Sequence, residues 1–372
     1  MKKKVLFIST SLGGGGAEKV LVTMLRYFDY EKYDVSLLLT VREGVYLDEI
    51  PSQVKLLYIF ECSSSLYAKI AFWLYARLRI GWLERFKIRR TIEQHYDTII
   101  SFVEGRAVKF HGDVLDRGSR NVSWVHTDMN NFHHSVGSGL SLSDEKYIYG
   151  KMSEIICVSQ DARKQFLAVY PGFKNALTVI YNPLDKEEII KKAEAGARYD
   201  SRFNFCSVGR LSPEKGVDRV IRVASRLKES GYKFAFHIIG EGEERPVLES
   251  MIKDACLEEV VQLHGFQKNP YPYIKNADCF VLPSRAEGFS LVCAEALILG
   301  APVISCRCAG PCELLNEGKY GELVDQSEDA LFVTCLRVLT NLEYRRELKN
   351  RSQCGGHSFD LEKIMQQVYS VI

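Results

Sequence analysis

Residues 5–28 read VLFISTSLGGGGAEKVLVTMLRYF, and the fold class follows from the order of their apolar and glycine residues. Residues 5–9 form an apolar run, glycines occupy 13–16, and the apolar residues after them recur with the period of a helix. This order predicts a buried strand, a glycine turn and a helix. Continuous apolar strands are typical of parallel sheets, whose two faces are covered by helices.

The same order of apolar runs and helical segments continues along the chain. In the first half, strands are predicted at residues 5–9, 34–40, 97–103, 121–126 and 154–159. After residues 178–185 the pattern restarts, with strands predicted at residues 203–211, 234–242, 260–266, 277–284 and 302–306. Helices are predicted between the strands, among them residues 217–230 and 245–256. This alternation indicates α/β domains with parallel sheets.

Two domains of ordinary size account for a chain of 372 residues. The pair Asn182-Pro183 marks their boundary, because the residue before a proline is biased away from helix. We therefore expect one Rossmann-like domain at residues 1–182 and a second at 183–358, facing each other across a central cleft. Residues 359–372 are expected to form an amphipathic helix, whose apolar face offers a surface for packing back on the first domain.

Composition and charge exclude several classes of protein. Hydrophobic residues make up 46% and charged residues 26%, which excludes disordered, collagen-like and coiled-coil chains. Lys and Arg number 49 against 47 Asp and Glu, so a net charge of +2 gives no general attraction for nucleic acid. No apolar run reaches the roughly 18 residues of a membrane span, and no signal peptide is evident. We expect a cytoplasmic protein whose 11 cysteines are reduced.

No metal site is expected from the sequence. The densest cysteine cluster, Cys306, Cys308 and Cys312, lacks the fourth ligand that tetrahedral zinc requires. No Asp-x-Asp pair occurs in the chain either. We therefore expect its chemistry to proceed without a divalent metal.

The glycine turn at 13–16 follows the first predicted strand and opens a helix. Its backbone amides can approach an anion without side-chain obstruction, so a bound phosphate or sugar is one interpretation and a tight turn without a ligand is the other. The dinucleotide pattern GxGxxG would need a third glycine where Glu18 stands, and the GEG at 240–242 lacks its third glycine at Arg245. An NAD-dependent enzyme is therefore disfavoured.

The loop GRLSPEKG, residues 209–216, follows another predicted strand and carries two cations. Arg210 and Lys215 lie five residues apart in it. A planar guanidinium and a compact ammonium suit a diphosphate, although an ordinary solvated loop has the same composition.

The segment PSRAEGFSLVCAEAL, residues 283–297, is the most informative one. A predicted strand ends at Leu282 and a helix begins near Ser290, so free N–H groups at the helix start point toward whatever Glu287 reaches. Glu295 follows on an otherwise apolar helix, where a carboxylate must be paired or hydrogen-bonded. A pairing with an arginine or with backbone amides is the interpretation that involves no ligand.

Taken together, these motifs resemble one known family. The spacing Glu287-x7-Glu295, the loop VGRLSPEKG and the early GGGGAEKV are similar, in this order, to the retaining family 4 glycosyltransferases of the GT-B fold. The resemblance extends over nearly the whole chain. It implies a first domain that binds the acceptor and a second that binds a nucleotide-sugar donor. The chain departs from the family at Pro183 and Ser290, where glycine is common.

The resemblance also implies a set of site residues. Those expected to take part in catalysis are Glu287, His126, Arg210 and Lys215. Those expected to bind the donor are Gly14, Gly15, Gly16, Arg210, Lys215, Phe289, Ser290, Leu291 and Glu295. The nucleotide sugar is a co-substrate, and the family resemblance implies no metal and no other cofactor.

The family pattern gives each residue of the second domain a role. Arg210 and Lys215 would hold the donor diphosphate and stabilise the charge that grows on it as the glycosidic bond breaks. Glu287 would contact hydroxyls of the transferred sugar, and Glu295 those of the ribose. The backbone amides of residues 289–291 would cap the distal phosphate.

His126 ends the predicted strand at 121–126. A histidine there is often a satisfied polar group, but the family has a histidine in this place that touches the donor sugar from the first domain. Residues 14–16 would line the cleft below it.

Residues 66–90 contain seven Lys or Arg against one acidic residue, interleaved with aromatic residues. Such a mixture suits a surface that lies on anionic lipid. A core helix with snorkelling basic ends is the alternative. The lipid interpretation predicts a protein on the inner face of the cell membrane.

The sequence thus predicts a hexosyltransferase. It would move a hexose or N-acetylhexosamine from a nucleotide sugar, with a UDP-sugar favoured and GDP-mannose as the alternative, to a lipid-linked or surface-polysaccharide acceptor with retention. The segment WVHTD resembles members that build lipopolysaccharide core or capsule repeats. A sugar-nucleotide epimerase of the same fold is one alternative. A non-catalytic sensor is another, but it would be expected to lack Arg210, Lys215 or Glu287, and all three are present.

Overall fold

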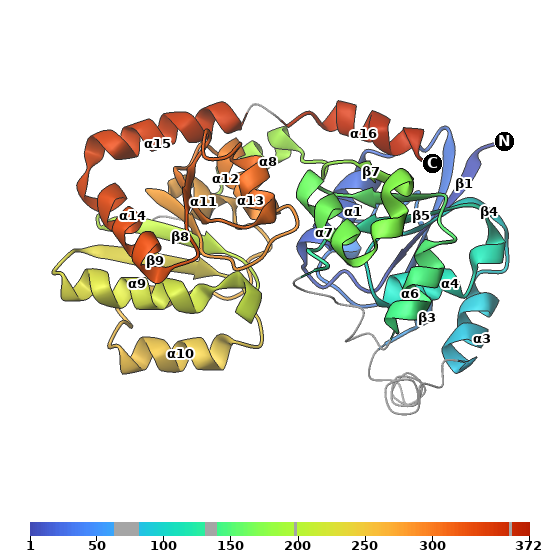
Figure 1. The fold of residues 1–372 in the computed structure, drawn as a ribbon, viewed down its shortest axis with the longest axis horizontal. Helices are drawn as coiled ribbons and strands as arrows, with labels where there is room; N and C mark the ends of the chain where they lie inside the picture. The colour runs from blue at the N-terminus through green and yellow to red at the C-terminus, as the bar shows by residue number, and fades with distance from the viewer. Residues whose placement is uncertain (63–81, 131–139, 197–198, 357–358) are drawn as a thin grey trace. The chain divides into compact units, whose positions relative to one another are not determined.

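The protein consists of two compact units built on parallel sheets. The computed structural model describes residues 1–62, 82–130, 140–196, 199–356 and 359–372. The first unit comprises Met1–Leu184 with Asp360–Ile372, and the second comprises Asp185–Phe359. In Figure 1 both ends of the chain lie in the first unit. The predicted α/β class, with two parallel-sheet domains, is confirmed.

The first unit contains a seven-stranded parallel sheet in the order β3-β2-β1-β4-β5-β6-β7. Its strands are β1 (Lys3–Ser9), β2 (Tyr33–Val41), β3 (Lys55–Phe60), β4 (Tyr96–Ser101), β5 (Gly118–Val125), β6 (Glu154–Cys157) and β7 (Leu177–Val179). Its described helices are α1 (Gly16–Arg26), α3 (Trp82–Thr91), α4 (Arg106–Gly112), α6 (Leu142–Tyr149), α7 (Gln160–Val169) and α16 (Leu361–Ser370), with 3₁₀ turns η1 (Leu47–Glu49), η2 (Leu115–Arg117) and η3 (Pro171–Ala176). The strand order reverses between β1 and β4, and sheets of this kind bind ligands at the carboxyl ends beside such a switch point.

Strand β1 has apolar side chains on both faces of the sheet, and both faces are covered by other parts of the first unit. Successive side chains of a strand point to opposite faces. Leu6 and Ile8 therefore pack with residues of α3 and α4 in one core cluster. Phe7 contacts Phe28 and Phe102 edge-on, with ring centroids 5.8 and 6.0 Å away.

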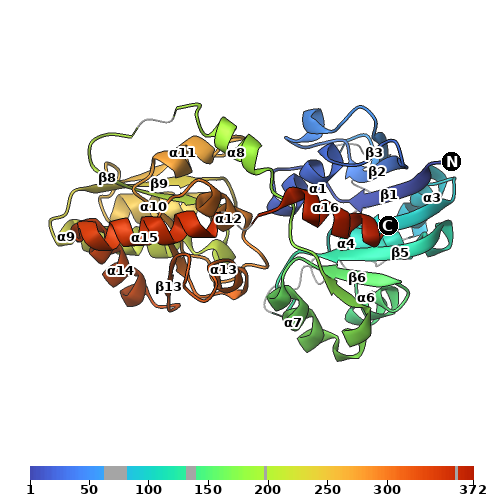
Figure 2. The same ribbon diagram turned by 90° about the horizontal axis from the view of Figure 1, so that it is seen from above.

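The C-terminal helix α16 packs within the first unit. Tyr369 stacks on Tyr33 of β2 with ring centroids 5.6 Å apart, and its hydroxyl donates to the Tyr27 carbonyl at 2.8 Å. Figure 2 shows α16 on the first unit. The last residues of the chain thus belong to the first unit, although they follow the second unit in the sequence.

The second unit contains a six-stranded parallel sheet in the order β10-β9-β8-β11-β12-β13. Its strands are β8 (Phe203–Val208), β9 (Phe234–Ile239), β10 (Val261–Leu263), β11 (Cys279–Leu282), β12 (Val303–Cys306) and β13 (Glu322–Val324). Its described helices are α8 (Lys186–Lys192), α9 (Val217–Glu229), α10 (Arg245–Asp254), α11 (Tyr271–Asn276), α12 (Leu291–Ile298), α13 (Ala309–Leu314), α14 (Glu328–Thr340) and α15 (Leu342–Gly355), with the 3₁₀ turn η4 (Pro213–Lys215). Here the strand order reverses between β8 and β11, which makes the loops after these two strands the expected ligand site.

Helices cover both faces of the second sheet. Residues of α9, α10, α14 and α15 form a core cluster on one face, and residues of α11 and α12 form a cluster on the other. Phe205 and Cys206, adjacent on β8, belong to these two different clusters. Both residues are fully buried.

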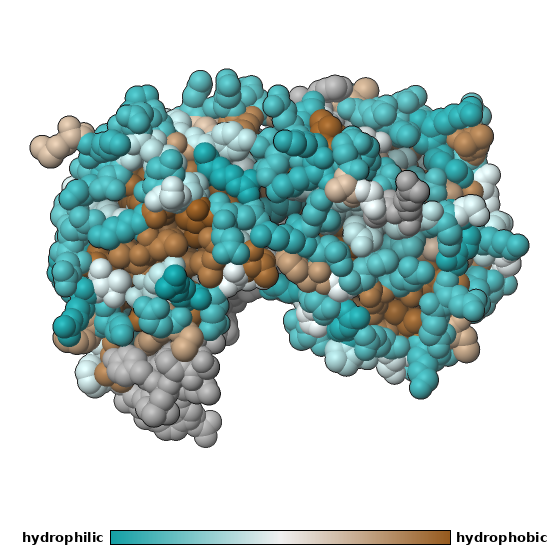
Figure 3. Space-filling view, turned by 180° about the vertical axis from the view of Figure 1, so that it is seen from behind, coloured by the Kyte–Doolittle hydropathy of each residue, from teal (hydrophilic) through white to brown (hydrophobic). Residues whose placement is uncertain are grey.

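One face of the molecule is mostly hydrophilic (Figure 3). Figure 3 shows hydrophilic residues over most of one face of the molecule, with smaller apolar areas on each unit. Among the residues that the structure describes, no helix has both the length and the apolar character needed to cross a lipid bilayer.

Candidate active site

The loops after β8 and β11 pack against each other at the switch point of the second unit. The Arg285 amide donates to the Glu214 carbonyl at 2.8 Å. Gly216 closes the first loop with a φ of 67°, and a Cβ atom there would overlap the carbonyl oxygen of Pro283. A glycine is required at 216, because the left-handed backbone and this close approach both disfavour a side chain.

Lys215 and Glu287 form an ion pair between these two loops. The Lys215 Nζ lies 2.8 Å from Glu287 Oε1 and 2.9 Å from Oε2, and Ser284 Oγ donates to Oε1 at 2.7 Å. Glu287 is 8% exposed, whereas the Lys215 side chain retains 26% exposure. An ammonium group has three donors, so this pairing fixes the cation while leaving it capacity to bind an anion.

Arg285 braces the loop that carries Glu287. Its guanidinium donates to both carboxylate oxygens of Asp218 at 2.8 and 2.7 Å and to the Pro213 carbonyl at 2.7 Å. Burial alone would raise the pKa of Asp218, but the hydrogen bonds from Arg285 and Arg222 lower it. Neither this brace nor Ser284 was predicted from the sequence. The brace joins Arg285 to Asp218 and Pro213, which lie 67 and 72 residues away, whereas Ser284 lies three residues before its partner Glu287.

The GEG at 240–242 has a packing role in the same place. A Cβ atom on either glycine would overlap a carbonyl oxygen, that of Gly209 or that of Leu211. The Leu211 amide also donates to the Glu241 carbonyl at 2.9 Å. The glycines thus bring the loop after β9 against the loop that carries Arg210, which is itself exposed. Close backbone packing accounts for them without a dinucleotide.

Helix α12 begins immediately after the Glu287 loop. Ser290, at its N-cap, has a φ of 70° and makes no capping hydrogen bond with its side chain. Ser290, Phe289 and Leu291 are 9% exposed or less, and Glu295 is fully buried. The predicted residues of this segment therefore lie in one buried loop and the helix that follows it. Anions are stabilised at such a helix start by its N–H groups and dipole.

The glycine turn of the first unit is closed by its own helix. The amides of Gly14 and Gly15 donate to Glu18 Oε2 at 2.7 and 2.9 Å, and Ser11 Oγ donates to Oε1 at 2.8 Å. Gly16 is the first residue of α1. Two of the amides that were expected to face a ligand are thus occupied by a carboxylate of the chain. At these amides the structure favours the tight turn over a phosphate site.

His126 lies at the carboxyl end of β5, in the first unit. Glu104 Oε1 accepts hydrogen bonds from the amides of His126 and Thr127 at 2.6 and 2.7 Å and from Thr127 Oγ1 at 2.9 Å. Burial lowers the pKa of His126 to about 4, although the Glu104 charge and a hydrogen bond with the Phe102 backbone oppose this shift. The imidazole is therefore neutral at pH 7. Its Nε2 atom is buried with no hydrogen-bond partner in the described part of the chain.

The predicted site residues thus fall into two groups. His126 and Gly14, Gly15 and Gly16 belong to the first unit, and the remaining ones to the second. Glu104, which holds the backbone at His126, was missed because no sequence pattern marks it. Within the described ranges, no group of three or more His, Cys, Asp or Glu is suited to hold a metal ion.

Comparisons with known proteins cover both units. A family model described as Glycosyltransferase Family 4 matches residues 14–188, and one described as Glycosyl transferases group 1 matches residues 188–353. The chain belongs to the family 4 glycosyltransferases. This confirms the family that the motifs predicted, and the chain is a hexosyltransferase.

Individual relatives agree with this assignment. The glycosyltransferase is 28% identical over 376 residues to the N-acetylgalactosamine-N,N'-diacetylbacillosaminyl-diphospho-undecaprenol 4-alpha-N-acetylgalactosaminyltransferase of Campylobacter jejuni, covering 98% of this chain and 97% of the relative. It is 26% identical over 216 residues to the lipopolysaccharide core biosynthesis glycosyltransferase LpsD of Rhizobium meliloti, covering 56% and 58% of the two chains. The crystal structure of Anabaena HepE in complex with UDP and glucose superposes with a TM-score of 0.79 at 20% identity, covering 99% and 98%. The fold is that of the GT-B glycosyltransferases.

Proposed function

We propose that this glycosyltransferase moves a hexose or N-acetylhexosamine from a UDP-sugar to a lipid-linked or surface-polysaccharide acceptor, with retention of the anomeric configuration. The second unit would bind the donor and the first unit the acceptor. One observation carries the proposal: the Lys215–Glu287 pair lies in the loops at the switch point, immediately before the start of α12. A cation, a carboxylate and helix N–H groups form a set that suits a sugar attached to a diphosphate.

The contacts of the second unit suggest a separate role in donor binding for each of its site residues. Lys215 and Arg210 would hold the diphosphate and stabilise the negative charge that develops on it as the sugar leaves. Glu287, fixed by Lys215 and Ser284, would accept hydrogen bonds from sugar hydroxyls. Glu295 would bind the ribose hydroxyls.

The first unit would supply a neutral group to the same reaction. Because the pKa of His126 is lowered to about 4, the imidazole offers a hydrogen bond without adding a positive charge. Its buried Nε2 atom would find a partner in the donor sugar. Glu104 would act as a positioning residue, since it holds the backbone of His126 in place.

The relatives support the choice of donor and acceptor. The Campylobacter relative is named for a diphospho-undecaprenol acceptor, and the Rhizobium relative for lipopolysaccharide core biosynthesis. Anabaena HepE was crystallised with UDP and glucose. GDP-mannose is the competing donor.

A transfer assay tests the proposal. Purified protein would be incubated with UDP-glucose, UDP-galactose, UDP-N-acetylglucosamine, UDP-N-acetylgalactosamine or GDP-mannose and a polyprenyl-diphosphate-linked glycan. We expect transfer from one of the UDP-sugars, and proton NMR of the fresh product should show an α linkage. Transfer from GDP-mannose alone would assign the donor differently, and a β linkage from an α-linked donor would overturn retention.

The same assay tests the expected independence from metal. Lys215, Arg210 and the N–H groups at the start of α12 would provide the field that a divalent cation provides elsewhere. Turnover should therefore continue in EDTA. Activity that disappears in EDTA and returns with magnesium or manganese would contradict this part of the proposal.

We also propose that α3 rests on an anionic membrane surface, which places the enzyme in the cytoplasm, on the inner face of the cell membrane. Of the basic segment at 66–90, residues 66–81 lie outside the described residues. Trp82 and Phe86, one helical turn apart on α3, are 64% and 61% exposed. The Arg85 side chain between them is 62% exposed. Exposed aromatic residues beside a cation suit the headgroup region of an anionic bilayer.

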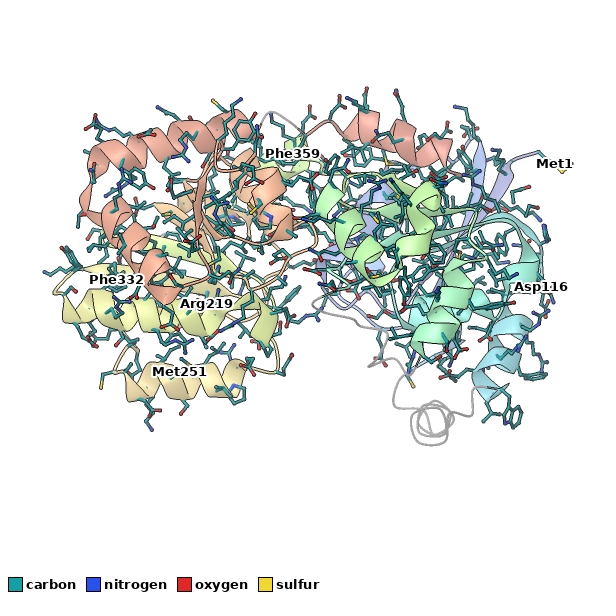
Figure 4. All side chains as sticks on the ribbon, viewed as in Figure 1. Met1, Asp116, Arg219, Met251, Phe332 and Phe359 are labelled. Carbon is teal, nitrogen blue, oxygen red and sulfur yellow. The ribbon has the colours of Figure 1, made fainter. Side chains whose placement is uncertain are left out.

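Ion pairs fix α3 to the first unit. Glu84 is fully buried and pairs with Lys109 of α4. Arg89 donates two hydrogen bonds of 2.7 Å to Asp116, which is labelled in Figure 4. The exposed aromatic side chains therefore belong to a helix whose other side packs on the core, where Ile88 is fully buried. Their exposure is what the lipid interpretation requires.

Sedimentation with vesicles tests the membrane proposal. The wild-type protein should pellet with phosphatidylcholine vesicles that contain phosphatidylglycerol and less with phosphatidylcholine alone. The double variant Trp82→Ala/Phe86→Ala should lose most of this binding. Tyr147→Ala is the matched control, because Tyr147 is 63% exposed on α6 of the same unit. Equal sedimentation of both variants would exclude α3 as the contact.

A further inference from the structure

Ser290 combines two unfavourable features in the free protein. Its φ of 70° lies in the left-handed region, which serine rarely occupies. The other described non-glycine residues with positive φ, Cys256, Asn316 and Glu317, are exposed, whereas Ser290 is 6% exposed. Strain that is stored in a buried residue points to a function for that residue.

The side chain of Ser290 does not cap the helix, although the residue occupies the N-cap position. A serine at an N-cap ordinarily accepts a hydrogen bond from an N–H group of its own helix. Ser290 makes no such bond, and its buried Oγ has no hydrogen-bond partner among the described residues. A buried hydroxyl without a partner lowers stability. Both features would be removed by a glycine, which fits this backbone without strain.

The groups around Ser290 indicate which kind of ligand could form a hydrogen bond with its hydroxyl. Ser290 lies at the start of α12, whose first N–H groups attract an anion. Glu287, three residues earlier, holds the Lys215 ammonium. A hydroxyl, backbone N–H groups and an ammonium are all donors toward oxyanions, and phosphate oxygens accept from each of them.

We propose that the Ser290 hydroxyl donates a hydrogen bond to an oxygen of the terminal phosphate of the donor nucleoside diphosphate. This inference rests on the proposed function, because it requires the second unit to bind the donor. It goes further in assigning a ligand to a side chain where the family often has glycine. The bound phosphate satisfies the hydroxyl and offsets the strain that the free protein carries at this residue.

Two substitutions separate the hydroxyl from the backbone strain. Ser290→Gly removes both, and Ser290→Ala removes only the hydroxyl. Thermal unfolding without ligand should show a higher Tm for Ser290→Gly than for the wild type, and a Tm for Ser290→Ala that is not lower than that of the wild type. A fall in Tm for both variants would show that the serine stabilises the free protein and would overturn the proposal.

Calorimetric titration with UDP and UMP then tests the ligand. UMP lacks the terminal phosphate and serves as the matched control. Both variants should bind UDP about tenfold more weakly than the wild type, as expected for one hydrogen bond to a charged group, and UMP within about twofold of it. Equal UDP affinity in all three proteins, or an equal loss for UMP, overturns the assignment.

Failure of the proposed function gives a different result. A wild-type protein that binds neither UDP nor GDP would contradict donor binding by the second unit, and this inference would fall with it. A wild-type protein that binds UDP while the variants bind it equally well leaves the proposed function intact and removes only the role of Ser290.

Discussion

The starts of α1 and α12 are alike in sequence context and opposite in their contacts. Each helix follows a glycine-containing loop at the carboxyl end of a parallel strand. At α1 the Glu18 carboxylate accepts from two amides of the turn. At α12 the N-cap residue Ser290 makes no capping bond, and its buried hydroxyl has no partner in the described residues. The turn before α1 is thus satisfied by a carboxylate of the chain, whereas the N-cap hydroxyl of α12 is not satisfied by any described residue, and a donor phosphate is the partner that we propose for it.

This difference shows why a glycine-rich turn is a weak indicator of a phosphate site. Judged by sequence alone, the four glycines at 13–16 are more typical of a phosphate-binding loop than the segment EGFS at 287–290 is. The decisive feature is instead which groups already occupy the N–H donors. An acidic side chain in the first turn satisfies a helix start internally, since it provides the negative charge that the dipole favours.

The largest effect is expected from the ion pair beside α12. Lys215→Ala should lower kcat by about 10²–10³, because it removes a cation that stabilises charge developing on the diphosphate. Glu287→Gln should lower kcat about a hundredfold, because the sugar would be held in the wrong position. It should also weaken discrimination between sugars that differ at one hydroxyl. Steady-state kinetics with the preferred donor and its epimer would measure both effects.

A surface ion pair of the same unit provides the control. Lys275 pairs with Glu194, and their side chains are 35% and 69% exposed. Such exposed ion pairs contribute little to the free energy of unfolding. Lys275→Ala should therefore leave kcat within about twofold of the wild type. A Lys215→Ala variant with the same kcat as Lys275→Ala would contradict the assignment of the site to the second unit.

The next effect concerns the backbone that builds this site. Gly216→Ala places a methyl group against the Pro283 carbonyl in a left-handed conformation, whereas Gly231, with a φ of 81°, has no atom within 4 Å of an added Cβ. Gly231→Ala should cost about 1 kcal/mol of unfolding free energy, from the backbone alone. Gly216→Ala should cost about 2 kcal/mol more, because the two loops must also separate. Urea unfolding curves of both variants would reveal the difference, and equal losses would show that the close approach at Gly216 is unimportant.

Sequence reasoning could find these loops but not their contacts. Arg210, Lys215 and Glu287 stand out because they are charged residues in loops that follow apolar strands. The contact between Lys215 and Glu287 depends on β8 lying beside β11, which is a property of the strand order. The left-handed backbone of Ser290 is likewise set by tertiary packing, against the residue's own preference.

Other elements were missed for local reasons. The strand β3, with the sequence KLLYIF, was not predicted, although five of its six residues are apolar. In the structure, four of its six residues are partly or fully exposed. The occupation of the glycine turn by Glu18 needs the turn geometry, which brings Oε2 within hydrogen-bond distance of Gly14 and Gly15. Burial of a carboxylate at Glu104 has no sequence signature either.

His126 of the first unit adds a second case to the comparison, because its Nε2 atom is buried and has no hydrogen-bond partner in the described residues. Its pKa in the folded protein is about 4, below the ordinary value of 6.5, so the unfolded chain binds the proton first as the pH falls. The stability it contributes is complete above pH 6.5 and is lost as the pH falls toward 4.

The His126→Phe variant isolates this contribution. Between pH 7.5 and 5.5 the wild type should lose about 1.4 kcal/mol more unfolding free energy than the variant does. His111 and His237, whose pKa values are also lowered to about 4 by burial, are present in both proteins and cancel in the difference. Urea unfolding at the two pH values measures it. Parallel curves for the two proteins would mean that the imidazole is not buried in its neutral form.

The smallest effect is expected at the start of α1, and it tests the comparison most directly. Glu18→Gln keeps one oxygen that can accept from the turn but loses the charge that faces the helix N-terminus, so the unfolding free energy should fall by about 1 kcal/mol. The affinity for UDP should stay within about twofold of the wild type, since the amides of Gly14 and Gly15 are occupied by the chain itself. Calorimetric titration with UDP beside urea unfolding would separate the two quantities. A tenfold change in UDP affinity would show that the turn takes part in donor binding, and the contrast between the two helix starts would then fail.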